Sequence, residues 1–166
     1  MTNRRGISNV IATIILIAVA IALAVAVAIW AFGLFRSNAH AGTLSSISQD
    51  LYIDSSTGTA YLVLYVSNPG GTTQNIASVT LNGNTCTYQG ASASAPSAAG
   101  LTSGGLSSTI TGVTPTNNMV GITGGTIAYL VYTCSGSYTP GVSYDGTIYL
   151  ASGSNIPFTV TAQSIS

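Results

Sequence analysis

The N-terminal part of the chain is apolar over a length that leaves no polar face. After Val10, Thr13 is the single polar residue before Arg36, and nothing polar occurs in residues 14–35. A bilayer core about 30 Å thick requires roughly 20 apolar residues in a helix. A helix that is apolar on every side offers no surface to water, which argues against a buried segment of a soluble domain. The pattern predicts a hydrophobic helix at residues 7–36 that can span a membrane.

Beyond residue 43, short apolar runs alternate with turn residues, which is the pattern of β-strands. Asn82-Gly83 lies between two such runs and is the strongest short signal for a β-hairpin. Seven to eight strands are expected, in residues 44–53, 61–66, 76–81, 85–88, 108–113, 126–134, 146–151 and 156–162. Their spacing is typical of a β-sandwich. Residues 89–108, rich in Gly, Ala and Ser, are predicted to form a long loop or a weakly ordered insertion.

The two patterns together predict an α+β protein in which a long N-terminal hydrophobic helix precedes an all-β, immunoglobulin-like sandwich domain. We expect a leader peptide at residues 1–6, the helix at 7–36, a neck at 37–43 and the β-sandwich outer domain at 44–166. An ordinary secretory signal also begins with positive charge, and Ala39 and Ala41 loosely match its cleavage motif. Its apolar region is shorter than this run, so that alternative is disfavoured.

Alanine alternates with larger apolar residues in the middle of the predicted helix. On a helical surface these alanines form two stripes with four-residue spacing. The stripes consist of Ala18, Ala22 and Ala26 in one case and Ala20, Ala24 and Ala28 in the other. Small residues at this spacing let helix backbones approach closely, although they are also common in any membrane helix. The stripes therefore favour packing of this helix against other helices.

The composition is nearly free of charge. Charged residues make up 4% of the chain, without Lys or Glu, against about 25% in ordinary soluble domains. Three arginines cannot form the basic surface that nucleic acid requires, so nucleic acid is excluded as a partner. The 22 Ser and 22 Thr residues supply polarity instead, and folding should depend only weakly on pH. Because no Asn begins an Asn-x-Ser/Thr sequence, any glycans are expected to be O-linked.

Residues capable of catalysis or metal binding are scarce. His40 is the single histidine and has no Cys or His nearby in sequence to complete a metal site. Asp50 and Asp54 lie on one face of a predicted strand, but more than about 10 Å apart, too far for a glycosidase pair. We expect no catalytic residue, no metal, no cofactor and no enzymatic activity.

Cys86 and Cys134 are the two cysteines, and both fall in predicted strands. In an exported domain they meet oxidising conditions, and closing a loop of this length stabilises by about 4 kcal/mol in the chain-entropy model. A disulfide is favoured, with two buried thiols as the alternative.

Nine tyrosines are the other conspicuous group. Tyr61 and Tyr65 share one face of their strand, whereas Tyr129 and Tyr132 fall on opposite faces of theirs. Burial in the sandwich core is the first interpretation, subunit contact the second and a carbohydrate-binding platform the third.

Residues 4–16, Arg-Arg-Gly-Ile-Ser-Asn-Val-Ile-Ala-Thr-Ile-Ile-Leu, resemble the start of archaeal type IV pilins and archaellins. The resemblance implies a class III signal peptide that a prepilin-type peptidase removes, with Arg5 and Gly6 as recognition residues and Ile7 as the first mature residue. Bacterial pilins usually have Glu at the fifth mature position, where this chain has Ile11, which favours the archaeal branch. Beyond about residue 35 the likeness is architectural, apart from the run 66–70, Val-Ser-Asn-Pro-Gly.

The resemblance also implies a function. A pilin would be held in the cytoplasmic membrane, processed, and polymerised with identical subunits by the pilus assembly machinery into an extracellular filament that serves surface adhesion. An archaellin of a motility filament would have the same architecture and is the first alternative. A monomeric, membrane-anchored domain that binds sugar through its tyrosines is the second.

Overall fold

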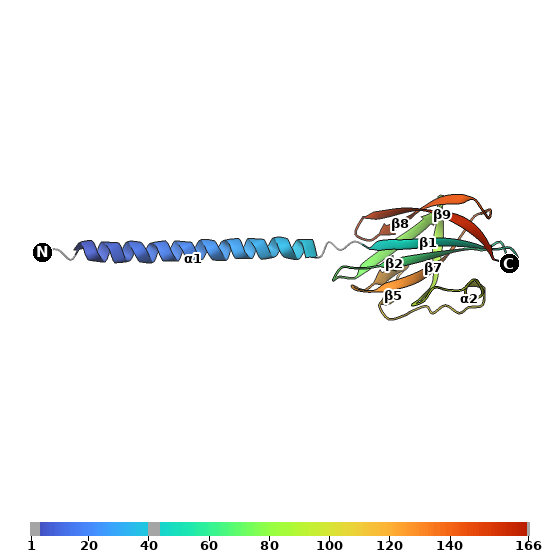
Figure 1. Ribbon diagram of the computed structural model, residues 1–166, viewed down its shortest axis with the longest axis horizontal. Helices are drawn as coiled ribbons and strands as arrows, with labels where there is room; N and C mark the ends of the chain where they lie inside the picture. Colours follow the sequence, from blue (N-terminus) through green and yellow to red (C-terminus); the bar gives the residue numbers. More distant parts are fainter. Residues whose placement is uncertain (1–3, 40–43, 166) are drawn as a thin grey trace. The chain divides into compact units, whose positions relative to one another are not determined.

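The chain consists of one long helix and one β-rich domain, seen in a computed structural model that describes residues 4–39 and 44–165 (Figure 1). The contacts divide it into two units between residues 41 and 42, and each is described by itself. Helix α1 (Arg4–Ala39) has 36 residues and a length of about 54 Å at 1.5 Å per residue. It contains the predicted helix 7–36 and begins inside the predicted leader. His40, with the rest of 40–43, lies outside the described residues.

Nine strands and a short helix make up the described part of the β-rich domain. They are β1 (Ser45–Asp54), β2 (Ala60–Ser67), β3 (Gln74–Leu81), β4 (Asn84–Ser92), α2 (Ala98–Thr102), β5 (Val113–Thr116), β6 (Met119–Ile122), β7 (Ile127–Cys134), β8 (Ser143–Leu150) and β9 (Asn155–Ile165). Most match a predicted strand within a few residues. The hairpin at Asn82-Gly83 is confirmed, because both residues have positive φ, 50° and 80°, as the favoured two-residue turn requires.

The strands form one sheet that closes on itself. Its order is β4-β7-β2-β1-β9-β8-β3-β6-β5, and an additional pairing of β4 with β3 joins the first seven strands into a ring. The coarse prediction, an apolar helix followed by a β-rich domain, is confirmed. The ring differs from the predicted immunoglobulin-like sandwich, whose two sheets remain separate. The reason is that β1 pairs in parallel with the C-terminal strand β9, Leu51 with Ala162 through Asp54 with Ile165, and so joins strands that would otherwise be edges.

The hydrophobic core fills the interior of this ring. Along β2, Leu62, Leu64 and Val66 point inward and are fully buried, as the two-residue period of a strand predicts. Equivalent positions of β3 and β8, such as Val79 and Ile148, complete the same cluster. Each such side chain stabilises the domain by about 1.5–3 kcal/mol through burial, so the ring encloses an apolar core.

Residues 89–108 are more ordered than predicted. Strand β4 extends to Ser92, and α2 begins after Ser97, whose hydroxyl accepts a hydrogen bond from the Gly100 amide at 3.1 Å. Leu101 of α2 is 4% exposed and packs with Val63 and Val131 in a second, smaller cluster. Because these two valines alternate with inward-facing residues of β2 and β7, the segment covers the outside of the ring. The half-buried Leu106 packs against the same cluster, and the Ala91 amide donates to the Ser107 carbonyl at 2.8 Å, so several contacts fix this segment.

The hairpin β5–β6 replaces the strand predicted at 108–113. Val113 pairs with Ile122 and Thr116 with Met119, and the turn between them is Asn117-Asn118. Both asparagines have positive φ, 47° and 68°, a conformation that Asn tolerates better than most residues. The hairpin is joined to the ring through β6, which pairs with β3.

Candidate assembly helix and the domain that follows it

Helix α1 presents apolar side chains on every side. Sixteen large apolar residues between Ile7 and Leu34 are exposed, and the most apolar 18-residue stretch within Gly6–Leu34 has a mean hydropathy of 3.2. Fully burying sixteen such side chains would be worth on the order of 25–50 kcal/mol. At about 1.5 Å per residue, the 29 residues of this segment also exceed the thickness of a bilayer core. The helix therefore needs an apolar partner, a membrane or other helices.

Thr13, the one polar side chain between Val10 and Leu34, forms its hydrogen bond within the helix. The Thr13 hydroxyl donates to the carbonyl oxygen of Asn9, one turn earlier, at 2.7 Å. Such a bond removes the need for a partner outside the helix. Thr13 therefore does not prevent this part of α1 from entering an apolar environment.

The predicted packing and processing residues all lie on α1. The six alanines of the two stripes, from Ala18 to Ala28, are exposed, and successive members of a stripe are about 6 Å apart along the axis. Gly6 and Ile7 are also exposed and belong to the first turns of the helix, and Gly6 has open space around the position of a side chain. Their roles in packing and cleavage stay predictions, and the side chain of Arg5 is outside the described ones.

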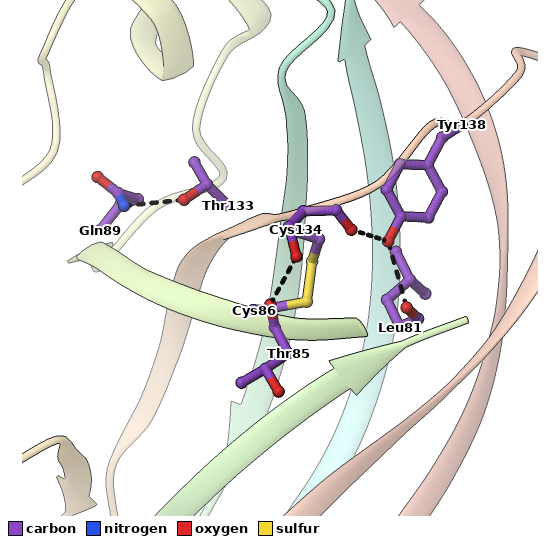
Figure 2. The surroundings of a disulfide bond; sticks show 8 residues. Leu81, Thr85, Cys86, Gln89, Thr133, Cys134 and Tyr138 are labelled. Atoms are coloured by element: carbon purple, nitrogen blue, oxygen red, sulfur yellow. Dashed lines mark hydrogen bonds between the residues drawn. A yellow bond between two sulfur atoms is a disulfide. The ribbon is translucent and has the colours of Figure 1, made fainter. Parts of the chain in front are cut away.

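The disulfide is the main covalent feature of the β-rich domain. Cys86 of β4 and Cys134 of β7 are bonded, with their Cα atoms 4.1 Å apart, and they are direct neighbours in the register of the two strands (Figure 2). Both are buried. Close by, the Tyr138 hydroxyl is shared between the carbonyl oxygens of Leu81 and Ser135 at 3.2 and 2.9 Å. Of the two alternatives for the cysteines, the disulfide is the one present.

Asn68 is a buried polar anchor that the sequence reasoning did not single out. It is fully buried, and its amide nitrogen donates to the carbonyl oxygens of Thr72 and Ile122, each at 2.8 Å. Its side-chain oxygen accepts from the Gly70 amide at 3.1 Å. These bonds tie the end of β2 to β6. The signal was available, because an Asn followed by Pro-Gly at a strand end is typical of a turn built on the Asn side chain.

Two of the three acidic residues, Asp54 and Asp145, accept hydrogen bonds in a turn and between strands. The Asp54 carboxylate accepts hydrogen bonds from the Ser56 amide at 2.9 Å, the Ser56 hydroxyl at 2.6 Å and the Thr57 hydroxyl at 2.8 Å. The bonds from Ser56, followed by those from Thr57, lower the pKa of Asp54 below its usual value. Asp145 of β8 accepts from the Thr159 hydroxyl at 2.7 Å. Within residues 4–39 and 44–165, no three His, Cys, Asp or Glu side chains gather in a way that could hold a metal ion.

The tyrosines divide between the two faces of the ring. Tyr65 and Tyr129 stack on the outside with ring centres 4.2 Å apart, and Tyr61 packs against the outer cluster under α2. Tyr132 points inward, as its opposition to Tyr129 predicts, and is 3% exposed. Tyr88 contacts it edge to face, with centres 5.5 Å apart. Core burial, the first interpretation, holds for Tyr132, whereas the outer tyrosines are half-buried.

The described part of the chain therefore combines an exposed apolar helix with a closed, disulfide-bonded β-domain. No family model and no curated protein matches the chain. Among solved structures, it is similar to the archaeal flagellum of Methanospirillum hungatei strain JF1, with 18% identity over 98% of this chain and 94% of that chain and a TM-score of 0.43.

Two further similarities are weaker in TM-score. The Iho670 flagellar-like filament has 20% identity over 96% of this chain and 100% of that chain, with a TM-score of 0.31. The secreted serine protease VesC from Vibrio cholerae has 11% identity over 76% of this chain and 24% of that chain, with a TM-score of 0.36. These comparisons concern the path of the chain and transfer no site residue.

Proposed function

We propose that this chain is the structural subunit, or pilin, of an archaeal type IV pilus, which polymerises through α1 into an extracellular filament used for surface adhesion. The observation that carries the proposal is the all-round apolar surface of α1 between Ile7 and Leu34. The proposal places the chain in the same kind of polymer as the archaeal flagellum of M. hungatei, to which it is similar.

Helix α1 must be shielded from water at every stage, because its side chains are apolar on all sides between Val10 and Leu34. A cytoplasmic membrane can hold the helix before assembly, and a bundle of identical helices can hold it afterwards, so transfer between the two exposes little apolar surface. Close packing in the bundle is the role proposed for the stripes that contain Ala22 and Ala24. Identical subunits in head-to-tail contacts that do not close form a helical polymer, in which the β-domains would face outward.

Processing by a prepilin-type peptidase would free the subunit from its leader between Gly6 and Ile7. Because α1 begins at Arg4, this bond lies in its first turns, which must unwind to enter a protease. Glycine lowers helix stability by about 1 kcal/mol relative to alanine, so Gly6 makes unwinding easier there. N-terminal sequencing of sheared filaments should begin at Ile7, and a start at Met1 or Thr2 would count against cleavage.

We also propose that the outer domain lies outside the cell and carries O-linked glycans. The disulfide suits an oxidising compartment, and many Ser and Thr side chains of the β-domain, including Ser94 and Thr111, are exposed. An intact mass above that of the processed polypeptide is expected for protein from filaments. A mass equal to the bare chain would rule the glycans out.

Polymerisation can be tested with substitutions that keep α1 apolar. Replacing Ala22 and Ala26 together by Leu preserves membrane insertion but adds bulk to one stripe, so backbones can no longer approach. The matched control replaces Ile21 and Val25 by Leu, at positions that are already large. We expect both variants in the membrane fraction at normal levels, and a drop of at least about tenfold in sheared filaments for the alanine variant alone.

Several results would contradict the proposal or redirect it. Equal filament yields from both variants would show that the alanine stripes do not take part in the helix–helix contacts of the filament. A wild-type protein found only in the membrane fraction would favour the monomeric, sugar-binding alternative. Filaments whose loss stops swimming but leaves attachment intact would assign the chain to the archaellins instead.

A further inference from the structure

The wall of the β-ring splits at one place, on a single edge of β3. Residues 79–81 of β3 pair with β4, whereas residues 74–76 pair with β6. Between these two stretches, Ala77 and Ser78 belong to neither ladder. Strand β4 and the β5–β6 hairpin therefore diverge from each other, and a pocket of about 340 Å³ lies at the split. We name it the fork pocket.

The fork pocket is neutral and of mixed polarity. Its lining comes from β3, β4, the β5–β6 hairpin and β7, and it contains no Asp, Arg or His. Hydroxyl and amide groups are supplied by Ser78, Thr87 and Asn117, and apolar surface by Met119 and Tyr88. Burying an ion here would leave its charge without a partner, which is strongly unfavourable. A charged ligand is therefore a poor fit.

One buried polar atom in the lining lacks a partner. The Tyr132 hydroxyl is buried, and within the part of the chain that the structure describes no group bonds to it. Tyr132 is itself a lining residue of the fork pocket, as is its neighbour Tyr88. An unpaired buried hydroxyl is unfavourable, because it has lost its bonds to water without gaining others. Less than 1 Å² of this atom is accessible, so a ligand hydroxyl bonds to it only after the neighbouring lining shifts, whereas a wholly apolar occupant leaves it unpaired in either case.

We propose that the fork pocket binds a single ring of a neutral carbohydrate. The volume is at the small end of known ligand sites, which run from about 300 to 1,000 Å³. Each sugar hydroxyl can both donate and accept, which suits the hydroxyls and amides of Ser78, Asn117 and Tyr132. The C–H groups of the ring suit the face or edge of Tyr88. The proposal goes beyond assembly and does not depend on it, because every lining residue belongs to the β-domain.

The probes are glucose, galactose, mannose and N-acetylglucosamine, added to the full chain in detergent micelles and measured by saturation-transfer NMR and equilibrium dialysis. We expect at least one of them to bind at millimolar concentration and gluconate, a charged analogue, not to bind. Tyr132→Phe removes only the unpaired hydroxyl and should weaken binding about fivefold, the value of one ordinary hydrogen bond. Tyr149→Phe, on the exposed side of β8, is the matched control and should bind normally.

Two further measurements separate loss of the ligand site from loss of the fold. Without sugar, Tyr132→Phe should unfold at the same urea concentration as the wild type or a higher one, because it removes an unpaired group. Met119→Trp should block the fork pocket and abolish binding while the domain remains folded. The proposal is overturned if none of the four sugars binds, if gluconate binds as well as they do, or if Tyr132→Phe binds like the wild type. A lower urea midpoint for sugar-free Tyr132→Phe would also overturn it, by showing that the hydroxyl is already paired.

Discussion

Breaking the bond between Cys86 and Cys134 measures how much the closed ring depends on a covalent link. The double substitution of both residues by Ala removes the disulfide and leaves no thiol or hydroxyl without a partner. The ladder between β4 and β7 continues beyond the bond, from Thr87 with Thr133 to Ser92 with Tyr129. We therefore expect the variant to fold to the same structure and to be less stable.

The size of the loss follows from the loop that the disulfide closes. The two cysteines are separated by 48 positions, and the loss of chain entropy in the unfolded state then stabilises the domain by about 4 kcal/mol at 25 °C. Domains have total stabilities of about 5–15 kcal/mol. The variant should thus stay folded at room temperature but melt roughly 10–20 °C lower. In urea, the midpoint should fall by about 2 M.

The aromatic residues allow the two units to be followed separately in one sample. All nine tyrosines lie after residue 44, and Trp30, the single tryptophan, is in α1. Near-UV circular dichroism of the tyrosines therefore reports unfolding of the β-domain in detergent, and Trp30 fluorescence reports the surroundings of the helix. Reducing the disulfide of the wild type with dithiothreitol should lower the free energy of unfolding by the same amount as the double substitution. A loss below about 1 kcal/mol in both experiments would refute the entropic reasoning.

Two further predictions concern polar groups of the β-domain. Its stability should be nearly constant between about pH 5 and 9. Hydrogen bonds from Ser56 and Thr57 lower the folded pKa of Asp54 below its unfolded value. The ionised Asp54 therefore adds to the stability of the domain above the unfolded pKa, and this stability is lost as the pH falls through the folded pKa. Burial raises the pKa of four tyrosines, Tyr52, Tyr88, Tyr132 and Tyr138. Their neutral forms add to the stability of the domain below about pH 10, and this stability is lost as the pH rises further. The test is the urea midpoint of unfolding measured against pH. Asp54→Asn should reduce the fall of this midpoint at acid pH, and a steep change of the midpoint between about pH 5 and 9 would contradict the prediction. Asn68→Ala should lower the free energy of unfolding by about 2–4 kcal/mol, because it leaves the carbonyl of Ile122 without its partner; a loss under about 0.5 kcal/mol in the same assay would show that Asn68 is not an anchor.

Predictions that depended on local sequence signals were reliable. The apolar run, the strand from Tyr61 onward and the turn at Asn82-Gly83 each depend on residues that are neighbours in the chain, so periodicity and turn chemistry identify them. The hairpin at Asn117-Asn118 could have been found by the same argument. It was missed because Pro115 and the polar residues around it interrupt the apolar pattern that marks a strand.

Long-range features had no comparable signal. The closure of the ring depends on the pairing of β1 with β9, more than 100 positions later in the sequence, and no local pattern specifies a partner at that distance. The fork pocket depends on two strands that share one edge of β3. The inward position of Tyr132 could be predicted from alternation, but its unpaired hydroxyl could not, because that depends on which segments surround it.

Closure of the ring also bears on how many copies of the domain can be crowded together. A strand with free amide and carbonyl groups at the end of a sheet is a template for pairing with another molecule, which leads to aggregation. In this domain β4 pairs with β3 instead of ending the sheet, and β5, the strand at the other end of the order, has four residues and contains Pro115, which has no amide hydrogen to donate. Neighbouring domains can therefore be held side by side at high local concentration without their sheets joining into one.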